Sequence, residues 1–246
     1  MRDWATGFQA ESLDDFAFSK KARERIQRFG LKTKMRNHLL LFGTSGIGKT
    51  AVARFLAGQN NADGIKEFAC ETLVSLTEKE RRLFHTEMIN RLDGGKKGIT
   101  KFFAASDRKT DVFIINEFHD LAEKGRNALK SVLENGLGRA IITTNSLNVI
   151  DAAIQSRCDL VNVDSVNYGE TQKSGKLVMR DDCGMSSGEW KKELMRVGGV
   201  YAKRNGYEAD DALAKSVLDE SMEHLWDLRK YVRNLQYAYE DKSGDL

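Results

Sequence analysis

The segment GTSGIGKT at positions 43–50 constrains the fold of this chain more than any other part of its sequence. It follows the apolar run His38 to Phe42 and precedes residues with helical spacing, which is the strand, loop and helix context of the phosphate-binding motif GxxxxGKT. Its glycines permit positive φ and let amide hydrogens converge on phosphate oxygens, while the helix N-terminus adds a favourable field. A glycine-rich turn that matches by chance is the alternative, and the ordered context disfavours it.

The motif predicts a site for the phosphates of a nucleotide. Lys49 would reach the β- and γ-phosphates, and Thr50 would offer its hydroxyl to Mg²⁺. The predicted nucleotide-binding residues are Gly43, Thr44, Ser45, Gly46, Ile47, Gly48, Lys49 and Thr50.

Apolar runs of strand length alternate with longer helical patterns over residues 1–165. The runs are Leu39 to Phe42, Ile65 to Ala69, Val112 to Ile115, Ala140 to Thr143 and Leu160 to Val163. Helical spacing is found at Phe16 to Phe29, Thr50 to Ala57, Lys79 to Leu92 and Arg126 to Leu133. The alternation predicts an α/β domain with a doubly wound parallel sheet.

The pattern changes after Asp164. Residues 166–188 are polar and contain glycines without a clear period, so they are expected to form a linker or an inserted hairpin. From Glu189 to the end, apolar residues recur at helical spacing, which predicts a small helical domain over residues 189–246.

Polar residues follow the third apolar run. Glu117 would orient or deprotonate an attacking water, because a carboxylate at the carboxyl end of a strand faces the phosphate crevice. Asn116 stands where a metal-side aspartate is usual; its carbonyl oxygen can accept a hydrogen bond, but it lacks the charge that holds Mg²⁺. Asp120 is expected to cap the next helix or to be solvated, and His119 is expected at the surface.

These motifs, in this order, resemble those of AAA+ clamp loaders, above all the large subunit of T-even-type phages. INEFHDL at 115–121 follows the phosphate-binding loop (P-loop), and Ile141 to Asn145 is similar to the sensor 1 strand. Gln155 to Cys158 is similar to the Ser-Arg-Cys motif, and Trp226 to Gln236 resembles the lid helix with sensor 2.

The resemblance implies an AAA+ P-loop fold with a five-stranded parallel sheet and a small C-terminal helical lid, ATP and Mg²⁺ as cofactors, and ATPase activity. Asn145 would contact the γ-phosphate or the attacking water, and Arg229 would face the nucleotide. Arg157 would act as an arginine finger on the ATP of a neighbouring subunit, since a guanidinium stays charged and bonds phosphate oxygens through several donors. The implied partners are a sliding clamp, primer-template DNA and other AAA+ subunits of a homo- or hetero-oligomer.

The family grips the DNA backbone independently of sequence. The candidate contacts are Lys96, Lys97, Lys101, Arg108 and Lys109, with Arg126 and Lys130 as an alternative coupling surface. A solvated basic loop explains the first group equally well.

Two departures from the family leave other functions open. Asn116 favours a nucleotide-binding structural subunit that hydrolyses little ATP, and a related helicase loader or initiator is a further alternative. The chain also ends soon after the expected lid helix, which leaves no room for the helical collar through which clamp-loader subunits assemble.

Composition limits the ligands, the cysteine chemistry and the cellular location that can be expected. The 39 basic and 36 acidic side chains are too balanced to indicate nucleic-acid binding by themselves. Cys70, Cys158 and Cys183 lack disulfide or zinc-ligand spacing, so reduced thiols are expected. The sequence has no membrane-spanning run and no signal peptide, which predicts a cytoplasmic protein without membrane contact.

Overall fold

The computed structural model describes residues 3–7, 9–30, 37–60, 66–70, 79, 112–121, 126–127, 130, 133, 139–164, 185–220 and 227–244. The basic segment with its five candidate DNA contacts, most of the expected linker and all of the predicted helix at 79–92 except Lys79 lie outside these residues. The chain divides into two compact units. One comprises Met1–Glu24, Gly43–Phe55 and Asn162–Leu246, and the other Arg25–Phe42 and Leu56–Val161.

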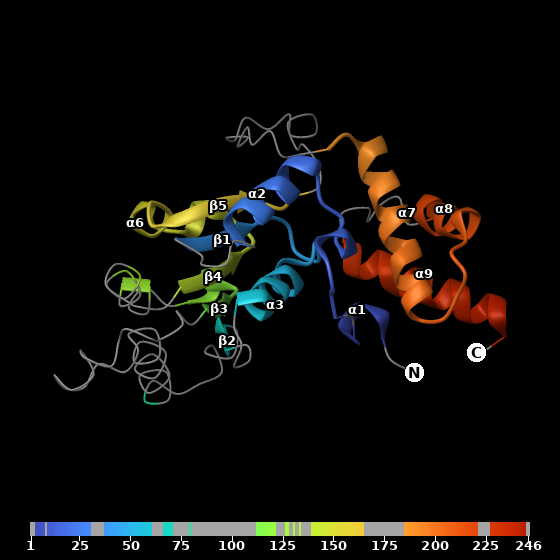
Figure 1. The fold of residues 1–246 in the computed structure, drawn as a ribbon, viewed down its shortest axis with the longest axis horizontal. Coiled ribbons are helices and arrows are strands. Elements are labelled where there is room, and N and C mark those ends of the chain that lie inside the picture. Colours follow the sequence, from blue (N-terminus) through green and yellow to red (C-terminus); the bar gives the residue numbers. More distant parts are fainter. Residues whose placement is uncertain are drawn as a thin grey trace. The chain divides into compact units, whose positions relative to one another are not determined.

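The sheet has the strand order β2-β3-β4-β1-β5 (Figure 1). Its strands are β1 (His38–Phe42), β2 (Lys66–Ala69), β3 (Val112–Asn116), β4 (Arg139–Thr144) and β5 (Cys158–Asn162). Parallel pairing joins β2 to β3, β3 to β4 and β4 to β1. The prediction of a parallel α/β sheet is therefore confirmed across four strands, with β5 next to β1 in the strand order. β5 begins two residues earlier than the predicted Leu160.

Apolar side chains bury the central strands on both faces, as expected for a parallel sheet covered by other elements. All five residues of β1 and of β3 are buried. One face packs into a core that contains Leu40, Phe113, Ile115, Ile142 and Ile154. The strand ends are thereby fixed, and the polar residues that follow them are held at defined positions.

Helix α2 spans Lys20–Gly30 and does not begin at Phe16 as predicted. The Ser19 hydroxyl accepts a hydrogen bond from the Ala22 amide at 3.1 Å, which caps the first turn there. Phe16 and Phe18 precede the helix as buried extended residues whose rings stack 5.5 Å apart. Their spacing matched a helical period, but tertiary burial explains it.

The remaining helices of the first half are short or follow a motif. Helix α3 (Lys49–Asn60) starts inside the P-loop, and α6 (Ala152–Gln155) precedes β5. Single 3-10 turns occur at Leu13–Asp15, Phe118–Asp120 and Leu147–Val149.

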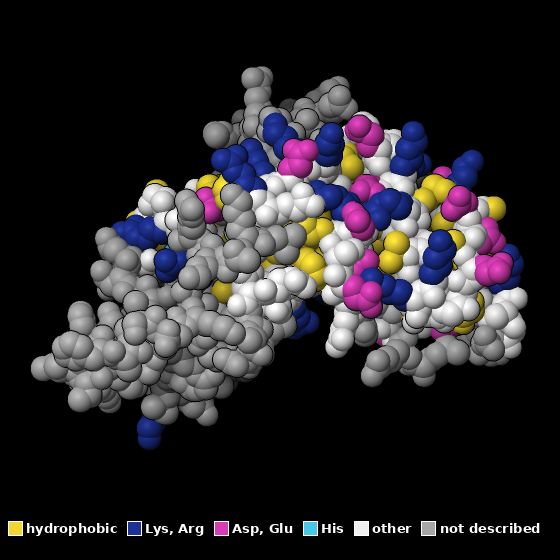
Figure 2. Space-filling view, in the orientation of Figure 1, with side chains coloured by type: hydrophobic (Ala, Val, Ile, Leu, Met, Phe, Trp, Pro, Cys, Tyr) yellow, Lys and Arg dark blue, Asp and Glu magenta, His cyan; other side chains and the backbone are white. Residues whose placement is uncertain are grey.

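Three helices pack together in the C-terminal part of the chain (Figure 1). They are α7 (Ser187–Arg204), α8 (Asp211–Glu220) and α9 (Leu228–Ser243). Helix α7 begins before the predicted Glu189, because Ser186 and Glu189 form a reciprocal capping box. Over these helices, basic and acidic side chains are interspersed on the face drawn in Figure 2, as on an ordinary solvated surface.

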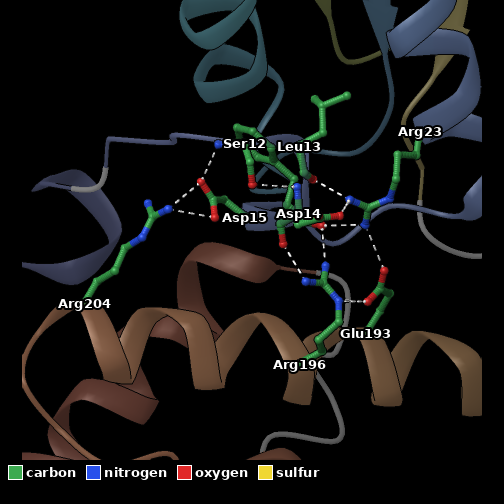
Figure 3. A network of polar contacts seen from close by, with 9 residues as sticks. Ser12, Leu13, Asp14, Asp15, Arg23, Glu193, Arg196 and Arg204 are labelled. Atoms are coloured by element: carbon green, nitrogen blue, oxygen red, sulfur yellow. Dashed lines mark hydrogen bonds and ion pairs between the residues drawn. The ribbon is translucent and has the colours of Figure 1, made fainter.

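The N-terminal segment is attached to this helical group. Helix α1 (Trp4–Gly7) packs on α9, and the Trp4 ring lies 5.6 Å from Tyr207 and 5.8 Å from Tyr239. Arg204 on α7 donates two hydrogen bonds to the buried Asp15 carboxylate, at 2.8 and 2.9 Å (Figure 3). The first residues of the chain are thus part of the same compact unit as its last helices.

Candidate nucleotide site

The P-loop has the backbone that its glycines permit. Gly46 and Gly48 have φ values of 80° and 97°, in the region that disfavours residues with a side chain. Lys49 begins α3 and is buried, and its Nζ donates to the carbonyl oxygens of Gly43 at 2.8 Å and Thr44 at 2.7 Å. Thr50 follows it, half-buried. The loop is therefore preformed, with its lysine folded across its own backbone.

Asp164, two residues beyond β5, holds the first turn of the loop. Its Oδ1 accepts a hydrogen bond from the Thr44 amide at 2.5 Å and another from the Thr44 hydroxyl at 2.9 Å. Burial raises the pKa of the Asp164 carboxyl, while the bonds from Thr44 and the charge of Lys49 act in the opposite direction. A residue distant in sequence thus positions the P-loop backbone.

The N-terminus of α9 also contacts the loop. Asp227 caps this helix by accepting from the Lys230 amide at 3.1 Å, and the Arg229 amide donates to the Gly46 carbonyl at 3.3 Å. A β-carbon on Gly46 would lie 2.2 Å from Asp227 Oδ1. Only glycine fits at this approach. The structure therefore brings the backbone of Arg229 to the loop, with its side chain exposed.

In the other compact unit, polar side chains meet at the carboxyl end of β3. Asn116 is buried, and its Nδ2 donates to Oε1 of Glu67 on β2. Its Oδ1 accepts from the Thr143 hydroxyl on β4 at 3.1 Å. The amide is therefore held from both sides by neighbouring strands.

Glu117 adopts a left-handed conformation, with φ 54° and ψ 48°, and it is the one non-glycine residue with positive φ in the described part of the chain. Its amide donates to the Thr143 hydroxyl at 3.1 Å. Such strain costs about 1–3 kcal/mol and is concentrated at functional sites. One threonine thus fixes both Asn116 and the predicted water-activating residue.

His119 is half-buried, with a side chain that is 23% exposed. Its Nε2 lies 3.2 Å from Nδ2 of Asn145, the predicted sensor 1 residue, and 3.8 Å from the Asp120 carboxylate. Asp120 ends the 3-10 turn as an exposed residue. Glu117, His119 and Asp120 offer possible ligand atoms within 4.8 Å of one another. The turn therefore connects Glu117 with Asn145.

Arg157 follows α6, and its Nη1 donates to the Ala153 carbonyl in an exposed hydrogen bond. The alternative DNA-coupling residues have partners within their own unit. Arg126 donates to the Val149 carbonyl at 3.2 Å, and Lys130 forms an ion pair with Asp151 at 3.0 Å.

Cys70 and Cys158 are free thiols, as predicted for these two residues, and Cys183 lies outside the described part. Burial raises the pKa of both thiols to about 12, with Asp120 and Glu117 contributing at Cys70. Both thiols are thus protonated and unreactive at neutral pH.

Comparison with known proteins identifies the domain. Residues 39–163, about half of the chain, match the family described as "ATPase family associated with various cellular activities (AAA)". The chain belongs to the AAA family. The AAA domain contains the P-loop, Asn116, Glu117, Asn145 and Arg157, and its family implies nucleotide binding with a divalent metal.

Two curated relatives of the AAA domain are DNA polymerase III gamma subunits of Buchnera aphidicola. The protein from the subspecies Schizaphis graminum is 27% identical over 139 residues, which cover 51% of this chain and 37% of the relative. The protein from the subspecies Acyrthosiphon pisum is 29% identical over 131 residues, which cover 48% of this chain and 36% of the relative. The matched region spans little more than a third of either relative.

Solved structures support the AAA fold. Two variants of RuvB from Thermotoga maritima align over 96% of this chain and 65% of theirs, with TM-scores of 0.62 and 0.61 at 17% and 16% identity.

Within the described helices, none combines the length and the apolar character that crossing a bilayer requires.

The oxygen donors of the AAA domain suit Mg²⁺, which prefers carboxylate, carbonyl and hydroxyl ligands. On α3, in one compact unit, Thr50 carries a hydroxyl. At the carboxyl end of β3, in the other unit, the Asn116 carbonyl retains a lone pair beside the bond from Thr143, and the Glu67 carboxylate contacts the Asn116 amide. Each of these oxygen donors is of a type that Mg²⁺ accepts.

The sequence did not reveal Glu67, Thr143, Asp164 or Asp227. The contacts that Glu67, Thr143 and Asp164 make with Asn116 and Thr44, and the approach of Asp227 to Gly46, join residues distant in sequence, so motif spacing carries no sign of them. Asn116 was the available signal, because the loss of an expected carboxylate is a reason to search the adjacent strand for another.

Proposed function

We propose that this chain is an ATPase subunit of a sliding-clamp loader, which uses ATP to place a ring-shaped clamp on primer-template DNA. The observation that carries the proposal is the similarity of half the chain to DNA polymerase III gamma subunits. The order of the P-loop, sensor 1, Ser-Arg-Cys and sensor 2 motifs supports it. The phage-type affiliation is a finer prediction, and the proposal does not depend on it.

In the proposed reaction, the residues of this chain bind the ATP phosphates and Mg²⁺ and orient the attacking water. Lys49 and the loop amides hold the ATP phosphates, and Thr50 contributes a ligand to Mg²⁺, which neutralises phosphate charge when it is bound. Glu117 orients the attacking water, with Asn145 beside it as the sensor. The strained Glu117 backbone and the bond from its amide to Thr143 support this role, because they fix the backbone from which the carboxylate extends.

Two further roles involve the C-terminal helices and a neighbouring chain. We assign residues 1–165 to the ATPase domain, 166–188 to a linker and 189–246 to a lid whose α9 carries Arg229. The contact of the Arg229 amide with Gly46 supports a lid that responds to the loop. Arg157 serves as the finger for the ATP of the next AAA+ subunit, and ATP binding thereby assembles the oligomer that grips clamp and DNA.

The direct test is ATP hydrolysis by the purified chain, alone and with candidate clamp and primer-template DNA. The proposal expects stimulation by clamp and DNA together, and loss of that stimulation in both Lys49→Ala and Arg157→Ala. Four-way junction DNA serves as the comparison substrate. Stimulation by the junction alone, with no response to clamp, would refute a clamp loader and favour a branch-migration motor.

A second candidate is an ATP-binding subunit that donates Arg157 but hydrolyses little itself. The observation that favours it is Asn116, which is neutral where an aspartate is usual and is held by Glu67 and Thr143. Tight ATP binding without turnover under every condition would support it, whereas brisk turnover by the unaltered chain would exclude it.

A further inference from the structure

Two arginines from different helices bind the backbone of the N-terminal segment (Figure 3). Arg196 on α7 donates to the carbonyl oxygens of Asp14 at 2.5 Å and of Phe16 at 3.0 Å. Arg23 on α2 donates to the same Phe16 carbonyl at 3.2 Å. A guanidinium presents its donors in a rigid fork, so one side chain can bind two acceptors in a fixed geometry. The main chain at Phe16 is therefore fixed by two helices.

Glu193 on α7 connects the two guanidinium groups. It accepts a hydrogen bond from Arg23 Nη2 at 3.0 Å and another from Arg196 Nε. The side chains of Glu193 and Arg23 are only 19% and 16% exposed, so solvent screens their charges weakly. Hydrogen bonds between charged groups are also stronger than neutral ones. Both arginines thus keep their orientation toward the Phe16 carbonyl.

The Phe16 ring lies beside the P-loop and the helix that follows it. Its Cδ1 is 4.0 Å from the position that a β-carbon on Gly48 would take, and its ring centroid is 6.1 Å from that of Phe55 on α3. Phe16 is only 2% exposed. These residues and Arg196 belong to the same compact unit. Phe16 therefore presents its carbonyl to the arginines and its ring to the P-loop.

The backbone of Gly48 depends on its neighbours for a fixed conformation. Gly48 has φ 97° and no side chain of its own to pack. The loop binds phosphate through amide hydrogens that converge on one point, so their positions must be accurate. A displacement of about 1 Å at such a site can cost about a hundred-fold in rate. We expect a shift of Phe16 to disturb this part of the loop.

We infer that Arg196 is a positioning residue for the P-loop. By binding the carbonyls of Asp14 and Phe16, it keeps the Phe16 ring beside Gly48 while the loop binds the nucleotide phosphates. Nucleotide affinity then depends on α7, which lies outside the region that matches the AAA family. The inference rests on the proposed function only in that the P-loop binds ATP, and it does not involve the clamp or the DNA.

The test measures the ATP affinity of the full chain by titration calorimetry with Mg²⁺, without clamp or DNA. Arg196→Gln should weaken binding about 2- to 30-fold, the range found for residues that act on a site through a neighbour. The variant should remain folded, because Arg23 still binds the Phe16 carbonyl. Arg196→Lys keeps the charge but loses the fork, so its affinity should lie between those of the parent and Arg196→Gln.

The matched control is Lys191→Gln on the same helix. Lys191 forms an ion pair with Asp219 at 3.7 Å, and the variant removes one positive charge from α7 without changing the arginine network. Its ATP affinity should equal that of the parent. An equal loss in Lys191→Gln and Arg196→Gln would overturn the inference, because the charge of the helix alone would then explain the effect.

A double-mutant cycle shows whether Arg196 acts through Phe16. Phe16→Leu keeps an apolar side chain and removes the ring, so Arg196→Gln should weaken ATP binding less in this background than in the parent. A purely structural role predicts the same loss in both backgrounds. That result, or an unchanged affinity in Arg196→Gln, would overturn the inference. If the cycle shows coupling but clamp and DNA do not stimulate hydrolysis, the clamp-loader proposal fails and the role of Arg196 stands.

Discussion

At the scale of single residues, two variants of Asp164 distinguish the effect of its hydrogen bonds at the P-loop from the effect of its charge. Asp164→Asn keeps an acceptor for both bonds from Thr44, while Asp164→Ala removes it. We expect the alanine variant to lose about 2–3 kcal/mol of unfolding free energy, because the bonds to an ionised acceptor disappear. Urea unfolding at neutral pH measures the unfolding free energy of both variants. Equal losses in Asp164→Asn and Asp164→Ala would contradict a role for the hydrogen bonds.

The pKa of Asp164 makes this comparison depend on pH. Burial raises the pKa in the folded chain, so the folded state binds a proton more readily than the unfolded state. The associated stability is present below the unfolded pKa and is lost as pH rises through the folded pKa. Relative to the parent, Asp164→Asn should therefore become more stable as pH rises across that interval. A stability difference between Asp164→Asn and the parent that does not change with pH would show that burial does not raise the pKa of this carboxyl.

The site residues differ in how far the sequence could predict them. Lys49 and Thr50 were predicted because the phosphate loop is local, and spacing alone defines its geometry. Glu67 lies in the four-residue strand KEFA, which is too short to show a period, and only the register of β2 on β3 brings it to Asn116. The contact of His119 with Asn145 was not predicted, because it joins two different strand ends. Long-range pairs of this kind have no signature in a single sequence.

At the scale of elements, α9 and the P-loop approach so closely that only glycine fits at position 46. Gly46→Ala would place a β-carbon against Asp227 and adopt a positive φ. Gly206, with φ 88° and no atom within 4 Å of a β-carbon, is the matched control for the backbone strain alone. We expect Gly206→Ala to lose about 1–2 kcal/mol and Gly46→Ala to lose more, together with ATP affinity.

Thermal unfolding and ATP titration measure these two effects. Adding Asp227→Ala to Gly46→Ala removes the obstructing carboxylate and should restore part of the affinity. If Gly46→Ala and Gly206→Ala lose equal stability and ATP affinity, the contact between α9 and the loop contributes to neither.

The N-terminal segment and α7 provide a second test between elements (Figure 3). Asp15 is buried and accepts hydrogen bonds from Arg204 and from the Ser12 amide, at 2.9 Å for the latter. Asp15→Ala removes these hydrogen bonds, while Arg204 keeps its ion pair with Glu11, and should cost about 2–3 kcal/mol. Asp14→Ala is the control, because Asp14 pairs with Arg23 through a largely exposed side chain and should matter far less. Similar urea midpoints for Asp15→Ala and Asp14→Ala would show that the bonds between Asp15 and Arg204 do not stabilise this unit more than the exposed pair does.

At the scale of the whole molecule, the sequence predicted the class of fold. The alternation of apolar runs predicted the parallel sheet, since the period of a strand is a local property. The boundary after residue 165 stays a prediction. The sequence did not predict that the N-terminal segment and the P-loop share a compact unit with the C-terminal helices, where Trp4 and Asp15 contact Tyr239 and Arg204. Such packing depends on tertiary contacts that no composition change marks.

Assembly gives the last prediction, because an arginine finger acts only on the ATP of another subunit. Lys49→Ala removes phosphate binding and keeps Arg157, while Arg157→Ala keeps the loop and removes the finger. Each variant alone should lose about a thousand-fold or more in kcat, the size of finger effects in related reactions. Mixed together, they should regain hydrolysis at interfaces where an intact loop meets an intact Arg157. Mixing Arg157→Ala with a Lys49→Ala/Arg157→Ala double variant supplies no finger and should stay inactive. If both mixtures are equally inactive in clamp-stimulated steady-state assays, Arg157 does not act between subunits, and the oligomer uses a different catalytic arrangement.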